Sequence, residues 1–292
     1  MGILEKLNQN KILLSDGAWG TLLQAKGLMP GECPELWNIT HRTEVMNIAS
    51  GYLEAGSDII GTNSFGGNRF KLAQYGLADR VEEINRAAAE ISRDVAGKNK
   101  HVAGSVGPTG KMLLLGDVSE KELYDAFCEQ SEALEEGGAD IIIIETMSAL
   151  DEASIAVKAA RENTKCTVIL TMTFSKTLKG EYRTMMGATP DQMVTVMKNA
   201  GAHIIGSNCG NGIEGMIGIV RAIRQVDKEI PVMIQANAGV PELIDGGTVF
   251  RESPQLMASF VPELIKSGAN IIGGCCGTTP DHIREIAGIL GR

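Results

Sequence analysis

Three cysteines have the residue type and the neighbours for metal chemistry. Cys275 and Cys276 are adjacent within the run Gly-Gly-Cys-Cys-Gly-Thr-Thr-Pro at 273–280, and Cys209 lies in Ser-Asn-Cys-Gly at 207–210. Three thiolates that converge would bind one zinc ion and leave one coordination position open, which is the arrangement of a catalytic rather than a structural zinc. Such a site requires a fold that brings these distant positions together.

The other three cysteines lack such neighbours. Cys33, Cys128 and Cys166 fall in a predicted loop, on a predicted helix and just before a predicted strand, and we interpret them as small packed residues. Six cysteines among 292 residues are too few for a disulfide framework. Thiols of this kind are typical of a reducing compartment.

Composition limits the classes of function. With 43% apolar residues and a formal charge of -9, the chain has the make-up of one large domain and no basic surface for nucleic acid or anionic lipid. Polar residues such as Glu5 and Lys6 interrupt the N-terminal segment, and no apolar run approaches bilayer length. We therefore expect a cytoplasmic protein that binds neither nucleic acid nor membrane.

Short β-branched runs alternate with segments of helical periodicity along the whole chain. Several runs are almost entirely apolar, which is typical of parallel strands covered on both faces. They predict eight strands, at 12–14, 59–62, 102–105, 141–144, 168–172, 204–207, 232–236 and 271–273. Capping signals, such as Ser119 with Glu122 and the pairs Thr189-Pro190 and Thr279-Pro280, begin helices. The pattern predicts a single α/β domain over residues 1–292, a (β/α)8 TIM barrel, with a doubly wound open sheet as the alternative.

In such a barrel the working face lies at the carboxyl ends of the strands. The polar residues that follow predicted strands are Asp16, Asn63, Ser64, Glu145, Asn208, Cys209, Asn237, Cys275 and Cys276. The sixth and eighth strands flank the seventh, and nearby glycines let the backbone turn both adjacent cysteines inward. A three-cysteine zinc site is predicted. The alternative is a pair of buried thiols or a vicinal disulfide, with Cys209 unrelated.

Two carboxylates share this predicted face. Asp16 and Glu145 could receive an ammonium group or act as a paired acid and base; otherwise Asp16 is a turn residue and Glu145 the partner of a polar core group. No histidine is predicted at the strand ends, because His101 and His203 precede strands. Activation of a substrate by a metal therefore fits better than histidine catalysis.

Two glycine-rich turns are weak candidates for anion sites. Residues 107–111, Gly-Pro-Thr-Gly-Lys, lack the glycine spacing and the following Ser or Thr of a P-loop. The turn Gly210-Asn211-Gly212 opens a predicted helix whose free amide groups could bind an anion.

Together these motifs resemble the homocysteine S-methyltransferase family, and most closely the homocysteine-binding barrel of cobalamin-dependent methionine synthase. The resemblance rests on residues 16–21, 61–66, 104–110, 145–146, 208–209 and 273–280. It implies that Cys209, Cys275 and Cys276 ligate zinc and that the substrate sulfur takes the fourth position. It further implies that Asp16 and Glu145 hold the ammonium group of the amino acid. The other strand-end residues, Asn63, Ser64, Asn208 and Asn237, are predicted to line the substrate site.

The resemblance leaves the methyl donor open. The chain has no Asp-x-His-x-x-Gly cobalamin motif, so we expect methylcobalamin on a separate corrinoid protein. Betaine-using relatives have a tyrosine where this chain has Thr146, and aromatic residues make up only 4% of the sequence. Residues 210–213 depart from the methionine synthase pattern, which suggests an alternative: a corrinoid-dependent enzyme that demethylates methoxylated or N- or S-methylated compounds, with zinc as Lewis acid. A non-catalytic zinc scaffold is a third hypothesis, and a homodimer is compatible with the predicted exposed helices.

Overall fold

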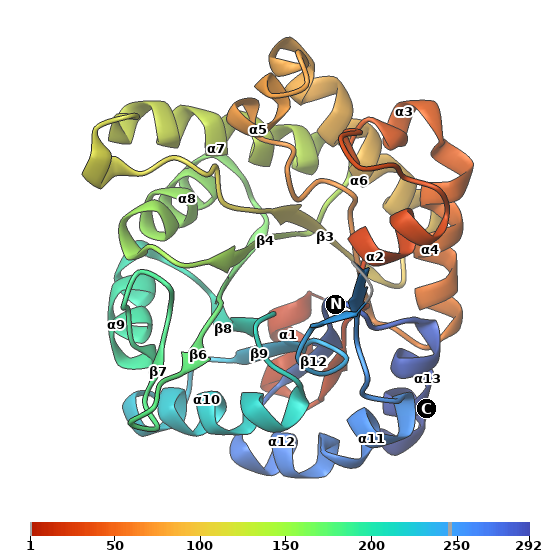
Figure 1. Cartoon of the computed structure of the whole chain (residues 1–292), viewed down its shortest axis with the longest axis vertical. Helices are drawn as coiled ribbons and strands as arrows, with labels where there is room; N and C mark the ends of the chain where they lie inside the picture. The colour runs from red at the N-terminus through yellow and green to blue at the C-terminus, as the bar shows by residue number, and fades with distance from the viewer. Residues whose placement is uncertain (1, 245–246) are drawn as a thin grey trace.

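The computed structural model describes residues 2–244 and 247–292, and its centre is an eight-stranded parallel sheet (Figure 1). The strands are β1 (Leu13–Leu14), β2 (Ile59–Gly61), β3 (His101–Val106), β4 (Ile141–Met147), β5 (Thr167–Met172), β8 (Ile204–Asn208), β9 (Val232–Ala236) and β12 (Ile271–Gly274). Each overlaps one of the eight predicted strands. Their apolar runs lie between the barrel interior and a shell of helices, which explains why alternation is weak in the sequence.

The sheet closes into a barrel. Its strand order is β1-β12-β9-β8-β5-β4-β3-β2, so β1 and β2 are the two ends. Ser15, just after β1, forms a parallel bridge with Ile59 of β2, and the backbone N–H of Asp16 donates to the carbonyl of Ile59 at 3.1 Å. The predicted TIM barrel is thus confirmed, and the open-sheet alternative is wrong.

Helices surround the strands (Figure 1). The longer ones are α4 (Arg42–Glu54), α6 (Val81–Ala96), α7 (Glu120–Glu136), α8 (Leu150–Asn163), α9 (Pro190–Ala200), α10 (Ile213–Val226), α12 (Val261–Ser267) and α13 (Pro280–Ile289). The predicted capping box of Ser119 and Glu122 begins α7, and Thr189 and Thr279 cap α9 and α13. Among the residues that the structure describes, no helix has both the length and the apolar character needed to cross a bilayer.

Shorter helices lie at the N-terminus and in the loops between the barrel strands and the longer helices. They are α1 (Ile3–Asn8), α2 (Gly20–Ala25), α3 (Trp37–Thr40), α5 (Arg69–Ala73) and α11 (Pro254–Ser259), with 3-10 turns η1 (Ala78–Arg80) and η2 (Leu113–Leu115). Helix α1 closes one end of the barrel, because Ile3 and Leu7 pack in a cluster with interior residues such as Ile59 and Ile141. The N-terminal half of the barrel is therefore filled by apolar side chains, and space for a ligand is left at the other end.

Two hairpins were not predicted. Strands β6 (Ser175–Lys176) and β7 (Tyr182–Arg183) pair after β5, and β10 (Glu242–Ile244) and β11 (Gly247–Val249) pair after β9. Strands of two or three residues are too short to show a periodic pattern, and so the sequence carries no signal for them. Both hairpins follow barrel strands, which places them beside the barrel mouth, the end where the parallel strands terminate.

Close contact between β8 and β9 gives a testable prediction for the fold. A Cβ atom on Gly206 would overlap the backbone carbonyl of Met233 on the neighbouring strand, and backbone cannot move aside as a side chain can. We expect Gly206→Ala to lower the free energy of unfolding by at least about 3 kcal/mol, measured by urea denaturation. Gly288→Ala, on α13 where an added Cβ would meet open space, is the matched control; equal stability of the two variants would contradict the prediction.

Candidate functional site

The three suspect cysteines converge at the barrel mouth. Cys209 follows β8, and Cys275 and Cys276 follow β12, on either side of β9. Their sulfur atoms all lie within 4.8 Å of one another, and the Sγ atoms of Cys209 and Cys276 are 3.9 Å apart. All three are free thiols, so the alternative of a vicinal disulfide is wrong.

The backbone around the cysteines is held by neighbouring strands. The N–H of Cys275 donates to Ala236 at 2.7 Å, and the carbonyl of Cys276 accepts from Ala238 at 3.0 Å. Gly277 follows with φ of +79°, a conformation that favours glycine. These contacts let two consecutive side chains reach one point, as the glycines around them suggested.

Cys209 is itself in a strained conformation. Its φ is 58°, in the left-handed region that residues with a Cβ rarely adopt, while its N–H donates to the carbonyl of Gln235 at 3.1 Å. Backbone strain of this kind costs about 1 kcal/mol or more and persists where the surrounding structure imposes it. Here it directs the thiol of Cys209 toward Cys275 and Cys276, which follow β12.

Hydrogen bonds within the sulfur cluster concentrate negative charge on one of its three sulfur atoms, that of Cys209. Hydrogen bonds from Cys275 and Cys276 lower the pKa of Cys209 to about 3. The shared hydrogen bond with Cys209 raises the pKa of Cys276 to about 11 and that of Cys275 well above its usual range. Without a cation the cluster therefore holds one thiolate and retains two protons, which a divalent metal would displace.

The donor set fits zinc. Tetrahedral zinc with Zn–S bonds of about 2.3 Å separates sulfur atoms by about 3.8 Å, close to the 3.9 Å between Cys209 and Cys276. Asn237 is buried beside them; its amide hydrogen-bonds Cys209, and its Oδ1 has no hydrogen-bond partner within the described part of the chain. Three sulfur ligands at this spacing suit a soft or borderline metal better than magnesium or calcium.

Asp16 lies at the wall of the same cavity. It is buried, and its carboxylate accepts hydrogen bonds from the N–H of Gly61 at 2.6 Å, from Nε1 of Trp19 at 2.9 Å and from Oγ of Ser15 at 3.2 Å. Burial raises the pKa of Asp16 to about 6, although these hydrogen bonds oppose the rise. With several partners and no cation, Asp16 is more than a turn residue.

Glu145 lies at a distorted position on β4. The register of β4 with β5 shifts between Ile144 and Met147, and Thr146 has a φ of 62°. This irregularity turns the partly buried Glu145 inward, where the hydroxyl of Ser105 donates to it. Burial raises the pKa of Glu145 to about 7, and the negative charge of Asp16 adds to the rise.

Asn208 connects this carboxylate to the sulfur cluster. Its side chain is fully buried and donates to Oγ1 of Thr146 at 2.8 Å, to Glu145 at 3.3 Å and to the sulfur of Cys275 at 3.8 Å. Its Oδ1 accepts from the N–H of Thr146 at 2.8 Å and from Thr171 at 2.7 Å. Asn208 thus fixes the strained turn that presents Glu145.

These groups share one central cavity of about 290 Å³ at the barrel mouth. Apolar side chains such as Trp19, Phe65 and Met233 form much of its wall. Its acidic and thiol groups come from Asp16, Glu35, Glu145, Cys209, Cys275 and Cys276. Among the described residues that line it there is no lysine, arginine or histidine. The cavity therefore holds three carboxyl groups and three thiols without a protein cation.

The remaining predicted residues have protein partners. Asn63 and Ser64 line the cavity, but Nδ2 of Asn63 donates to Pro34 at 2.7 Å and Oγ of Ser64 to Ser105 at 2.7 Å. Their contact with a substrate stays a prediction. Glu35, Ser105 and Gln235 also line the cavity and were not predicted from the sequence. Gln235 alternates with Met233 along a strand that leads to Asn237, and this pattern could have indicated it.

Both glycine-rich turns are occupied by carboxylates of the protein itself. Glu152 accepts from the N–H of Thr109 at 2.8 Å and from its hydroxyl, and so fills the turn at 107–111. Glu252 accepts from the N–H of Ile213 at the start of α10 and lies against Gly212. Neither turn is free to bind an external anion.

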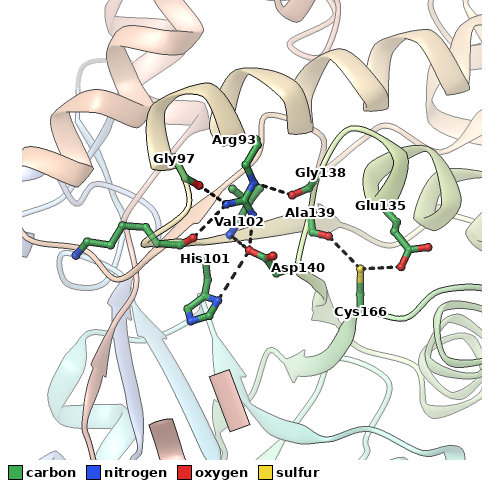
Figure 2. Close-up of polar contacts among 10 residues, drawn as sticks. Arg93, Gly97, His101, Val102, Glu135, Gly138, Ala139, Asp140 and Cys166 are labelled. Carbon is green, nitrogen blue, oxygen red and sulfur yellow. Dashed lines mark hydrogen bonds and ion pairs between the residues drawn. The ribbon is translucent and has the colours of Figure 1, made fainter. Parts of the chain in front are cut away.

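The histidines expected at the far end of the barrel are there. Figure 2 shows His101 with its Nδ1 atom 3.8 Å from Asp140, whose carboxylate also binds Arg93. Cys166 lies nearby and donates to the carbonyl of Ala139 at 3.3 Å (Figure 2). Burial raises its pKa to about 12, in agreement with its interpretation as a packed residue.

Comparison with known proteins places this site in a family. A model of the family described as homocysteine S-methyltransferase matches residues 13–290. Methionine synthase from Mycobacterium leprae is 31% identical over 307 residues, and that from Mycobacterium tuberculosis is 32% identical over 302. These alignments cover 99% and 98% of this chain but 25% of each relative, so the chain spans a quarter of their length.

A solved structure shows the same fold. The metallated homocysteine methyltransferase MmuM from Escherichia coli superposes with a TM-score of 0.79 at 23% identity, covering 97% of this chain and 98% of that one. A methyltransferase from Methanosarcina mazei shares the architecture more distantly, with a TM-score of 0.62 at 12% identity. The family match over nearly the whole barrel, together with the cysteine cluster at its mouth, shows that this chain belongs to the homocysteine S-methyltransferase family.

Proposed function

We propose that this protein transfers a methyl group to the sulfur of homocysteine at a zinc site formed by Cys209, Cys275 and Cys276, and so produces methionine. The observation that carries the proposal is the central cavity, which combines three sulfur atoms and three carboxyl groups and has no cationic side chain among its described lining residues. A zinc ion and an α-ammonium group are the two positive charges that such a cavity lacks. Homocysteine supplies the ammonium group and a thiol that can complete the metal site.

Zinc, when bound, would lower the pKa of the incoming thiol so that its sulfur is a thiolate at neutral pH. The sulfur then attacks the methyl carbon in line: the S–CH3 bond forms as the bond to the donor breaks, and that electron pair stays with the donor. The sulfur loses its charge as the thioether forms, and a zinc ion held by Cys209, Cys275 and Cys276 would bind this neutral sulfur less strongly than the thiolate.

Asp16 and Glu145 hold the amino acid for this step. Their carboxyl groups come from different strands, Asp16 from the segment after β1 and Glu145 from β4, and both line the cavity. An ammonium group between them offsets the cost of burying two negative charges, because opposite charges within about 4–6 Å favour each other's charged forms. The barrel thus fixes the ammonium end while the cysteines fix the sulfur end.

We propose a methyl-corrinoid protein as the donor. The loops at the barrel mouth carry strongly exposed apolar side chains, among them Leu114 after β3, Leu178 after β5, and Val240 and Leu243 after β9. We call these four residues the mouth ring. Exposed apolar side chains around a site typically mark an interaction surface. A protein that carries a methyl-corrinoid would contact the mouth ring as it presents the cofactor, and the ring offers that protein an apolar surface.

Demethylation of another methylated compound is the second candidate. The turn that follows the cavity-lining Cys209 reads Gly210-Asn211-Gly212, unlike the methionine synthase pattern. The carboxyl-rich cavity and the family match favour an amino-acid thiol over a neutral methoxylated compound. A scaffold without catalysis would gain nothing from two carboxylates beside an open metal position.

The metal site can be tested by cobalt substitution. We expect about one zinc per chain in the native protein, and we expect L-homocysteine to strengthen and shift the sulfur-to-cobalt bands of the cobalt form at micromolar concentration, because a fourth thiolate enters the coordination sphere. Cys276→Ala should lose most of the metal and all methyl transfer with an unchanged circular dichroism spectrum. Cys128→Ala, on α7 away from the site, is the matched control.

Two results would overturn this proposal. A metal-loaded protein whose spectrum does not respond to homocysteine would favour the demethylase alternative. Methyl transfer at the normal rate by the metal-free Cys276→Ala variant would exclude a zinc mechanism.

The raised pKa values predict how binding depends on pH. Asp16 and Glu145 have pKa values of about 6 and about 7 in the free site, and only their ionised forms attract an ammonium group. As pH falls from 8 to 6, Glu145 becomes mostly protonated and Asp16 about half protonated. The dissociation constant of homocysteine should therefore rise by roughly 20-fold more than that of 4-mercaptobutyrate.

4-Mercaptobutyrate is the matched ligand because it lacks only the amino group and loses the same thiol proton at the metal. Calorimetric titration of both ligands, with the zinc content measured at each pH, tests this difference. The same pH dependence for both ligands would show that the carboxylates do not hold the ammonium group.

The mouth ring can be tested by charge substitution. Leu114→Asp and Leu243→Asp should each slow methyl transfer from a methyl-corrinoid protein at least about fivefold through weaker docking, with no change in transfer from free methylcobalamin. Ile289→Asp, which also replaces an exposed aliphatic side chain but at the C-terminal end of α13, is the control. Loss of both activities in the Leu114 and Leu243 variants would point instead to damage of the site.

A further inference from the structure

Gln235 is a polar side chain in the central cavity to which neither the sulfur cluster nor the two carboxylates assign a role. It is only 7% exposed and lines the cavity together with Met233 from the same strand. Its Oε1 atom is buried and has no hydrogen-bond partner within the described part of the chain. A buried acceptor without a partner costs free energy, so its presence at a ligand cavity indicates that a ligand supplies the donor.

The position of Gln235 follows from the barrel. On β9, Gln235 is the Cα partner of Asn208 on β8 and of Gly273 on β12. Its backbone carbonyl accepts the N–H of Cys209 at 3.1 Å, so one residue both supports the sulfur cluster and sends its amide into the cavity. The side chain therefore starts from a rigid strand and not from a loop.

Gly273 leaves the space that Gln235 uses. A Cβ on Gly273 would lie 2.8 Å from Cβ of Ser15, 2.9 Å from the carbonyl of Asp16 and 3.4 Å from Cγ of Gln235. A larger residue here would separate the Gln235 side chain from the segment that carries Asp16. With glycine at this position, Gln235 on β9 and Asp16 after β1 both line the same cavity.

We propose that Gln235 binds the α-ammonium group of the substrate. Its Oε1 atom accepts a hydrogen bond from one N–H of this group, while Asp16 and Glu145 accept hydrogen bonds from the other two. An ammonium group has three N–H donors, and these are three acceptors from β1, β4 and β9 around one cavity. The amide adds selectivity that two carboxylates alone lack, because it requires a directed N–H and not only a positive charge. This inference rests on the proposed function, since it assumes an amino-acid thiol in the cavity.

The test compares two ligands in three proteins. Gln235→Met keeps the shape of the side chain and removes its polar end, and Gln235→Glu keeps an acceptor oxygen at the same place. We expect Gln235→Met to raise the dissociation constant of L-homocysteine by about 10- to 100-fold and that of 4-mercaptobutyrate by less than about threefold, measured on the cobalt-substituted proteins. In Gln235→Glu, binding of homocysteine should stay within about threefold of the native value.

Each outcome decides a separate point. Equal weakening of both thiols in Gln235→Met would overturn the ammonium role, because the loss would then lie in packing or at the metal; the metal content of each variant identifies the second case. Unchanged homocysteine binding in Gln235→Met would overturn it as well. If the native cobalt protein binds neither thiol, both the proposed function and this inference fail. If the native protein binds both thiols normally but Gln235→Met does not weaken homocysteine binding more than 4-mercaptobutyrate binding, only the inference fails.

Discussion

The site depends on an unbalanced concentration of negative charge. Three carboxyl groups and three thiols line one cavity in which no described lining residue is cationic. A protein interior does not solvate isolated charges, so such groups either retain protons or acquire a cation. The raised pKa values of Asp16 and Glu145, and the two protons held by the sulfur cluster, are the first response; ligands with positive charge are the second. The charge of the cavity would therefore be balanced by a positively charged ligand.

Barrel closure is what makes this concentration possible. Cys209 and the pair at 275–276 lie far apart in the sequence, and they meet because β8 and β12 flank β9. Asp16 enters the same ring because the segment after β1 bonds to β2. The cost of this geometry appears locally, as left-handed backbone at Thr146 and Cys209. Asn208 holds the first of these turns through three hydrogen bonds to Glu145 and Thr146, and it makes two more, to Thr171 and to the sulfur of Cys275.

The sequence predicted those parts that depend on repeated patterns. Eight apolar runs separated by helices were enough for the barrel, and residue type with strand-end position was enough for the cysteines, Asp16 and Glu145. It did not predict the two hairpins, whose strands are too short for periodicity, or the contacts of Ser105 and Glu35. Those contacts depend on which side chains meet across the barrel, and only the three-dimensional register determines that.

The position of Gln235 shows how one strand can serve both halves of the site. Its carbonyl supports Cys209, its side chain faces the cavity, and Asn237 two residues later reaches the same cysteine. Because side chains alternate along a strand, a shift of β9 by one residue would turn the Gln235 side chain away from the cavity. Strand β9 therefore contributes to both parts of the site, while the cysteines follow β8 and β12 and the two carboxylates lie after β1 and on β4.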